Sequence, residues 1–170
     1  LLNALIDSYE ARHVATVDIK GAFLKVSVPE DLELIVKMTG EMAQMMCKLD
    51  PSLQCDEYGV LYLQCEKALY GHIEAARLFY DDFDHSIQHK MNFEQNRYDP
   101  CVYNKRTKDG MITIRTHVDD LKISSTSKQQ LEHTIEQLRS IYGEITVHNG
   151  PEHDYLDMIL VYHPEQKISQ

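Results

Sequence analysis

Two adjacent aspartates, Asp119 and Asp120, separate two runs in which apolar and polar residues alternate. This alternation is typical of β-strands, so the pair is predicted at a hairpin tip, where aspartate is also common for backbone reasons alone. A third carboxylate, Asp18, falls on the polar face of an earlier alternating run, HVATVDIKGAF. If these strands are neighbours, the carboxylates converge, and like charges at that spacing favour a bound cation. Carboxylate oxygens suit Mg²⁺, and a pair of such ions supports transfer of a phosphoryl or nucleotidyl group.

The remaining sequence predicts the elements that would position these carboxylates. Besides residues 13–23, strands are predicted over 32–38, 59–65, 101–106, 111–118, 121–125, 144–148 and 155–162. Helices are predicted over 40–49, which Pro51 ends, over 74–91, and over 128–142, which Ser127 caps and Gly143 ends. The second helix carries the apolar stripe Ala76, Phe79, Phe83 and Ile87, and the third carries Leu131, Ile135, Leu138 and Tyr142.

The order of the central elements is strand, helix, strand, strand, helix, strand. This order is typical of the split βαβ, ferredoxin-like arrangement, in which an antiparallel sheet packs against helices. We therefore predict an α+β fold, in which the strand of Asp18 lies beside the hairpin of Asp119 and Asp120.

Composition limits the classes of function. The 170 residues fit one domain, and the net charge of −10 argues against a protein whose whole surface binds phosphates. The four cysteines lack CxxC spacing and are interpreted as free thiols. No apolar run approaches the roughly 20 residues that span a membrane, and no signal peptide is present at the start, so an intracellular protein without membrane contact is expected. The chain begins at Leu1 and ends at Gln170 without a clear stop, and we interpret it as a piece of a longer protein.

Two other groups of residues resemble metal sites. His85 and His89 have the helical spacing of a zinc-binding pair, but no further ligand of suitable spacing accompanies them. The stretch YDDFD, residues 80–84, is acidic. We interpret the histidines as solvent-facing and the aspartates as the hydrated face of an amphipathic helix.

Five sequence blocks carry a family resemblance. They are ATVDIKGAFL, KALYGHIEAARLFY, YDPCVYNK, HVDDLKIS and HDYLDMIL, which begin at residues 15, 67, 98, 117 and 153. In this order and at this spacing they resemble the reverse transcriptase domain of copia-type LTR retrotransposons. The resemblance implies that residues 1–170 are the palm and part of the fingers of an RNA-directed DNA polymerase, with the upstream fingers, thumb and RNase H outside this range. We expect such a piece to polymerise poorly by itself.

The resemblance also implies roles for individual residues. The metal ligands for two Mg²⁺ or Mn²⁺ ions correspond to Asp18, Asp119 and Asp120, with the backbone carbonyl of Ile19 as a further ligand. The nucleotide-binding residues correspond to Lys20, Gly21, Phe23, Tyr70 and Gly71, and the primer and template residues to Arg77, His117 and Asp157. Some of these have simpler interpretations: Phe23 as a core residue, Gly21 as a turn residue, and Arg77 as one member of a surface ion pair.

The implied partners are a primed RNA or DNA template, a dNTP, and the integrase and RNase H domains of the same polyprotein. The implied location is the cytoplasm, in a virus-like particle, with entry into the nucleus. His117, Glu74, Ala76 and Asp157 depart from the commoner family pattern. A catalytically inactive relic, or a palm co-opted as a binding module, therefore stays open as an alternative function. A nucleotidyl cyclase or another phosphotransferase is a third, and the blocks around residues 70 and 98 count against it.

Overall fold

The computed structural model of the chain describes residues 2–162. It separates into two compact units, the first made of Leu1–Ala22 with Tyr80–Gln170 and the second of Phe23–Phe79. The three aspartates singled out in the sequence all belong to the first unit.

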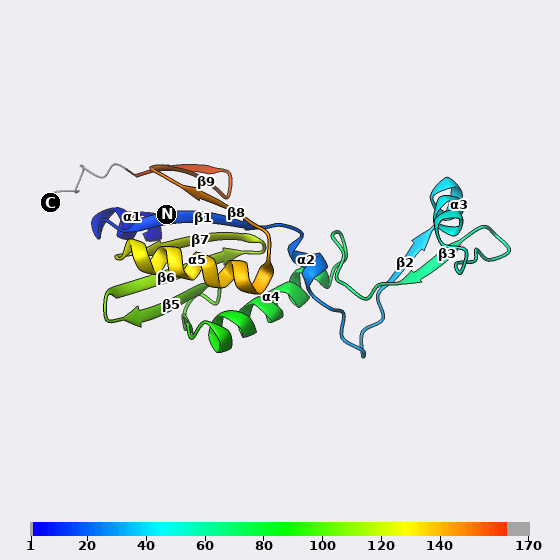
Figure 1. Cartoon of the computed structure of the whole chain (residues 1–170), viewed down its shortest axis with the longest axis horizontal. Helices are drawn as coiled ribbons and strands as arrows, with labels where there is room; N and C mark the ends of the chain where they lie inside the picture. The colour runs from blue at the N-terminus through cyan, green and yellow to red at the C-terminus, as the bar shows by residue number, and fades with distance from the viewer. Residues whose placement is uncertain (1, 163–170) are drawn as a thin grey trace. The chain divides into compact units, whose positions relative to one another are not determined.

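The first unit is built on an antiparallel sheet, seen in Figure 1 with helix α5 lying across it. Its described strands, in spatial order, are β4 (Glu94–Gln95), β5 (Val102–Thr107), β6 (Gly110–His117), β7 (Asp120–Ser125), β1 (His13–Ile19) and β8 (Ile145–Asn149). The order β6-β7-β1-β8 of the central strands is that of a split βαβ unit, because α5 connects β7 to β8 and α4 precedes the β5–β6 hairpin. The predicted α+β, ferredoxin-like fold is confirmed.

Helix α5 (Lys128–Tyr142) forms where its capping signals predict. The hydroxyl of Ser127 accepts a hydrogen bond from the backbone N–H of Gln130, which satisfies one of the free donors of the first turn. Gly143 ends the helix with a positive φ of 74°, a conformation that a residue without Cβ adopts at little cost. The predicted stripe of Leu131, Ile135, Leu138 and Tyr142 is buried.

Helix α4 (Ala75–His85) continues into a π-helical turn, η1 (Ser86–Lys90). Phe79, Phe83 and Ile87 are buried as predicted, but the prediction for Ala76 is wrong. Ala76 is exposed, and Ala75 is 1% exposed. The reason is the spacing of the stripe: its buried positions are four residues apart, at 75, 79, 83 and 87, so Ala75 and not Ala76 lies on the buried face.

The apolar face of the sheet packs against these helices. Phe83 stands edge-on to Tyr103 of β5 at 5.9 Å and stacks with Tyr142 of α5 at 6.1 Å. From the strands, the fully buried side chains on this face include Ile19, Leu121, Ile123 and Ile114. Each such side chain contributes roughly 1.5–3 kcal/mol when it leaves water, so this face supplies most of the stability of the unit.

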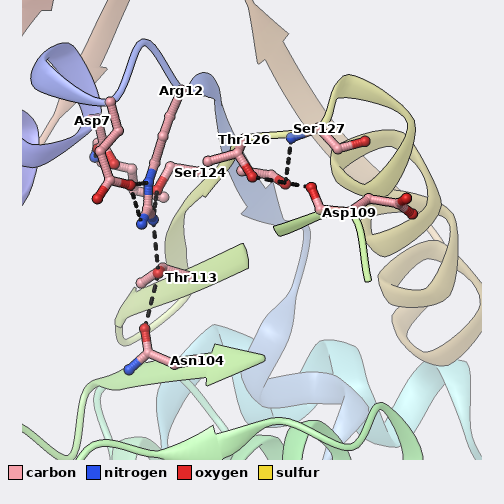
Figure 2. A network of polar contacts seen from close by, with 11 residues as sticks. Asp7, Arg12, Asn104, Asp109, Thr113, Ser124, Thr126 and Ser127 are labelled. Carbon is pink, nitrogen blue, oxygen red and sulfur yellow. Dashed lines mark hydrogen bonds and ion pairs between the residues drawn. The ribbon is translucent and has the colours of Figure 1, made fainter. Parts of the chain in front are cut away.

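The opposite face of the sheet is polar although much of it is buried (Figure 2). Helix α1 (Leu2–Tyr9) contributes Asp7, which forms an ion pair with Lys122 of β7. The guanidinium of Arg12 donates to Thr113 of β6 at 3.1 Å, and the Thr113 hydroxyl donates to Asn104 of β5 at 2.9 Å. These contacts satisfy polar groups that would otherwise be costly to bury, and they join α1 and the segment that follows it to β5, β6 and β7.

The last described segment corrects a prediction. Residues 155–162 do not form one strand, because β9 (Glu152–Tyr155) turns back at Leu156 and Asp157 into β10 (Met158–Val161). Both turn residues have positive φ, 54° and 57°, as a two-residue hairpin turn requires. The sequence hides this turn because such positions usually hold glycine or asparagine, and Leu156 breaks no apolar pattern.

The second unit contains a smaller set of elements. It includes α2 (Ala22–Lys25), which starts at the end of the first unit, and an antiparallel pair of strands, β2 (Ile35–Met38) and β3 (Leu61–Gln64). Between them lies α3 (Gly40–Leu49), which forms over the predicted residues and ends before Pro51. Both strands are shorter than the predicted 32–38 and 59–65.

The buried ion pair between Asp7 and Lys122 generates a stability prediction. The two residues are 2% and 3% exposed, so Asp7→Asn leaves the ammonium of Lys122 buried without a counter-charge. We expect a loss of about 3–5 kcal/mol in the free energy of unfolding, measured by urea denaturation.

The double variant Asp7→Leu with Lys122→Met should recover most of that loss, because it removes both charges. As a control, Glu132→Gln breaks the exposed pair with Lys128 and should cost under about 1 kcal/mol. A loss as small as the control's would contradict the assignment of a buried charge pair.

Candidate active site

The pairing of β1 with β7 brings two of the three predicted aspartates together. Asp18 and Asp120 are direct partners in the antiparallel register, so their side chains project from the same face of the sheet. Asp119 lies in the two-residue turn between His117 and Asp120, which are themselves partners across β6 and β7. The backbone N–H of Ile19 donates to the carbonyl of Asp119 at 3.4 Å, which ties the turn to β1.

The turn at Val118 and Asp119 has an unusual backbone. Val118 has a φ of 57°, which is rare for a β-branched residue and costs of order 1–3 kcal/mol. Strain of this kind persists only where the surrounding structure enforces it, and it gathers at functional sites. This backbone conformation could not be predicted from the sequence, because valine is not a residue that such turns select.

A row of side chains crosses the sheet at this level. The register places His117, Asp120, Asp18 and Thr146 side by side on β6, β7, β1 and β8. Two residues further back, roughly 7 Å along the strands, the next row holds Arg115, Lys122, Thr16 and His148. The carboxylates therefore stand at the tip of the polar face, with two basic residues behind them.

The two basic residues behind the carboxylates already have acidic partners. Lys122 is paired with Asp7, and Arg115 lies 3.6 Å from Asp99. Burial lowers the pKa of Lys122, although Asp7 acts in the opposite direction. This back row therefore does not cancel the negative charge at the tip.

The pKa of Asp120 reflects the negative charge at the tip. Partial desolvation of the exposed Asp120 side chain, followed by the nearby carboxylates of Asp119 and Asp18, raises the pKa of Asp120 above its usual value, while His117 acts in the opposite direction. Like charges that raise a pKa in this way favour a cation among them. The donors are carboxylate oxygens, the type that Mg²⁺ and Mn²⁺ prefer, so the residues fit a hard divalent ion.

The described residues do not include a ready-made metal cluster. Among residues 2–162, no group of three or more His, Cys, Asp or Glu side chains is arranged so that it could hold a metal ion. The same holds for the histidine pair on α4 and η1: His85 and His89 are exposed, with ring centroids 4.6 Å apart, and form no such group.

The acidic stretch on α4 is only partly hydrated. Asp81 and Asp82 are exposed as predicted, but Asp84 is half-buried. Its carboxylate accepts hydrogen bonds from the hydroxyl of Tyr103 at 2.9 Å and from the amide of Gln88 at 2.8 Å. The prediction of a wholly hydrated face is therefore wrong for Asp84, because Tyr103 of the neighbouring strand reaches it.

A cavity of about 660 Å³ opens beside the carboxylate row. Asp18, Asp120 and His117 line one side, and the β9–β10 hairpin lines the other with Glu152, Asp154, Tyr155, Leu156 and Asp157. Asp157, predicted to contact the primer, thus lies at a hairpin tip beside the candidate site. Sequence reasoning missed Glu152 and Asp154, although their alternation with the buried His153 and Tyr155 is a strand signal.

The hairpin is held against β1 by a buried histidine. His153 is 1% exposed, and its Nδ1 lies 3.4 Å from the hydroxyl of Thr16. Burial lowers the pKa of His153, which favours the neutral ring. Thr16 was expected on the open face together with Asp18, but this contact buries it, so only the tip of that face is open.

The predicted nucleotide-binding residues divide between the two units. In the first unit, the exposed ammonium of Lys20 forms an ion pair with Glu144 at 2.5 Å. The hydrogen bond to Glu144 is the main cause that raises the pKa of Lys20. Gly21 has a φ of 62°, so the turn that follows β1 favours glycine.

In the second unit, Phe23 is 8% exposed and packs on Tyr70, with ring centroids 4.4 Å apart. Gly71 has a φ of 89° and no atom close to where a Cβ would stand, so its backbone conformation alone favours glycine. The exposed side chain of Arg77 lies 3.8 Å from Glu74, the ion pair that the simpler interpretation expected.

The first unit is a split βαβ sheet with carboxylates at the tips of its central strands. This is the architecture of a polymerase palm. The sequence comparison then identifies the family. The model described as "Reverse transcriptase (RNA-dependent DNA polymerase)" matches residues 1–156. The chain therefore belongs to the reverse transcriptase family.

Comparison with solved structures finds the telomerase of Candida albicans in complex with a fragment of telomeric RNA. The match has a TM-score of 0.47 and 9% sequence identity, and it covers 94% of this chain. The chain corresponds to 33% of the telomerase chain. No curated protein matches the sequence. In the part of the chain that the structure describes, no helix is long and apolar enough to cross a membrane.

The raised pKa of Asp120 generates a prediction about the metal-free protein. Because the ionised carboxylate is disfavoured in the folded state, Asp120→Asn should raise the melting temperature at pH 7 in EDTA. The gain in the free energy of unfolding should be at most about 1 kcal/mol, since solvent screens the site. The gain should shrink as the pH falls through the raised pKa of Asp120, because the wild-type carboxyl then takes up a proton. The exposed Asp31→Asn serves as the control and should change little. A lower melting temperature for Asp120→Asn at pH 7 would contradict the electrostatic account.

Proposed function

We propose that the chain is the catalytic palm, with part of the fingers, of a copia-type retrotransposon reverse transcriptase, a nucleotidyltransferase that extends a primer 3′-hydroxyl with dNTPs on an RNA template. The observation that carries the proposal is the register that pairs Asp18 with Asp120 and places Asp119 in the adjoining turn. Membership of the reverse transcriptase family and the five blocks at copia-type spacing support the same activity.

We assign the first unit to the palm and the second, Phe23–Phe79, to part of the fingers. The remainder of the fingers, the thumb and RNase H would come from other parts of a pol polyprotein that also carries integrase. Such a protein would work in the cytoplasm, within a virus-like particle, and reach the nucleus with its DNA product.

In this proposal, Asp18, Asp119 and Asp120, with the carbonyl of Ile19, hold two Mg²⁺ or Mn²⁺ ions. Bound there, the ions would activate the primer hydroxyl and neutralise charge on the α-phosphate and the departing pyrophosphate. The contribution of the chain is to hold the carboxylates on adjacent strands whose backbones are tied together, so that little reorganisation is needed when substrate binds.

The nucleotide-binding roles follow the positions of the remaining residues. The backbone N–H groups of Lys20 and Gly21, which directly follow β1, would approach the triphosphate. Phe23, with Tyr70 packed on it, would limit the space for a 2′-hydroxyl on the incoming sugar, and Gly71 would line the nucleotide and template side. Arg77 is exposed and would contact template phosphate in place of Glu74.

His117 and Asp157 would meet the primer. Both line the cavity beside the carboxylate row, together with Glu152 and Asp154. These acids repel a phosphate backbone, so the primer would need cations from parts of the polymerase beyond this palm. This matches the net charge of −10, because the basic residues that bind a duplex would lie in the rest of the fingers, the thumb and RNase H.

The second candidate function is a palm without catalysis, either a relic or a co-opted binding module. The acidic lining of the cavity and the replacement of a usual glycine by Asp157 favour it. The two candidates differ in whether the carboxylates still bind metal and still support synthesis.

Asp119→Asn in the full-length polyprotein tests the activity. We expect Mg²⁺-dependent primer extension on an RNA template to fall by at least about 10³-fold, because the variant removes a charge that stabilises the transition state. Asp109→Asn, at the tip of the β5–β6 hairpin, is the matched control and should retain activity. Primer extension by the Asp119 variant at the level of the control would contradict the assignment of Asp119 as a catalytic metal ligand.

Metal binding tests the site without activity. Mg²⁺ or Mn²⁺ should raise the melting temperature of this chain, because a ligand that binds the folded state stabilises it by mass action. Asp18→Ala should lose that rise, while Asp109→Ala should keep it. A metal-dependent rise that survives in Asp18→Ala would show that the ion binds elsewhere.

A further inference from the structure

Two cysteines of the second unit face each other. The Sγ atoms of Cys47 and Cys55 lie 3.3 Å apart, and both side chains are half-buried. Cys47 lies in the last turns of α3, and Cys55 lies in the loop that leads to β3. Neither residue belongs to the candidate active site, and both are present as free thiols.

The loop that carries Cys55 is held in place by its own hydrogen bonds. The carboxylate of Asp50 accepts from the backbone N–H and the hydroxyl of Ser52, at 2.9 and 2.6 Å. The carboxylate of Asp56 accepts from the backbone N–H groups of Tyr58 and Val60, at 2.9 and 2.8 Å. These local bonds restrict the loop on both sides of Cys55. The approach of the thiols is therefore built into the turn rather than left to a free chain.

We propose that Cys47 and Cys55 are a modification site at which a peroxide forms an intramolecular disulfide. The sulfurs need to approach by roughly 1.3 Å to reach bonding distance. In the first step the Cys47 thiolate attacks a peroxide oxygen, which breaks the O–O bond and yields a sulfenic acid and an alcohol, or water from hydrogen peroxide. In the second step the Cys55 thiol attacks the sulfenic sulfur, the S–S bond forms, and water leaves. The peroxide is reduced by two electrons and the two thiols are oxidised.

The environment assigns different roles to the two thiols. The hydrogen bond with Cys47 is the main cause that raises the pKa of Cys55, followed by burial and by the charges of Cys47 and Asp56. A raised pKa keeps Cys55 in its thiol form, so we assign the resolving step to Cys55 and the first oxidation to Cys47. The same hydrogen bond keeps Cys55 next to the sulfur that it must attack.

The product would join the end of α3 to the loop through a short covalent ring. Such a ring limits the freedom of the unfolded chain, so oxidation should raise the melting temperature of the protein. Cys65 and Cys101 are also free thiols, but Cys101 lies in the first unit and burial is the main cause that raises its pKa. They serve as internal references for unselective oxidation.

Peptide mapping of the wild-type chain tests the proposal without any variant. The reduced protein is treated with hydrogen peroxide, remaining thiols are alkylated, and the digest is analysed by mass spectrometry. Trypsin places Cys47 alone in residues 38–48, whereas Cys55 and Cys65 share residues 49–67, and cleavage after Glu57 separates these two. We expect a loss of two hydrogens in the intact chain and a cross-link between Cys47 and Cys55, while Cys65 and Cys101 stay alkylated.

Two serine variants give the matched comparison. Cys55→Ser should abolish the cross-link and leave Cys47 as a sulfenic acid that a dimedone probe captures, and Cys65→Ser should cross-link like the wild type. Reduction with dithiothreitol should restore both alkylated peptides. The proposal fails if peroxide oxidises Cys101 while Cys47 and Cys55 both remain alkylated, or if Cys47 links to Cys65 instead. Either result would leave the polymerase assignment untouched, because that assignment rests on carboxylates of the first unit and not on these thiols.

Discussion

The antiparallel register between β1 and β7 is the constraint on which the site depends. In this register Asp18 faces Asp120 on the polar side, while Val17 and Ile19 point into the core with Leu121. A slip of one residue would turn Asp18 toward the apolar face and bring a core residue to the tip. The geometry of the candidate site is thus enforced by the same alternation that builds the core, because a charged residue cannot enter that core without a large desolvation cost.

The candidate site carries two unfavourable features. Three carboxylates share one tip, and Val118 occupies a backbone region that β-branched residues avoid. These costs are offset elsewhere, by the buried aromatic contacts of α4 and α5. The polar face is therefore divided in two: its rear is closed by α1 and the His153 contact, and its tip stays open beside the cavity.

The polar residues of β7 alternate along the strand, but they differ in burial. Asp120, Lys122 and Ser124 follow each other at a spacing of two on β7, yet Asp120 is exposed while Lys122 and Ser124 are buried. The difference comes from Asp7 of α1 and from Arg12 of the segment after α1, which contact Lys122 and Ser124. A strand pattern indicates which residues share a face, but not which part of that face another element will cover.

How much the sequence predicts depends on the range of the interaction. Helix α3 forms over the predicted residues and α5 begins and ends at its caps, Ser127 and Gly143, because propensity and capping act within one or two turns. The alternation around Asp18, Asp119 and Asp120 was sufficient to predict strands and a hairpin tip. The turn at Leu156 and Asp157 was missed, since its residues are not those that select such a turn.

By itself, the sequence determined the types and order of the central elements and the carboxylates that we propose as metal ligands, because these follow from local periodicity and from side-chain chemistry. The strand order, the pairing of Asp18 with Asp120, the burial of Lys122 against Asp7 and the approach of Cys47 to Cys55 were decided only in the tertiary structure. The first three join distant segments of the first unit and form only when its sheet and helices pack together, whereas Cys47 and Cys55 are brought together by the local turn between them.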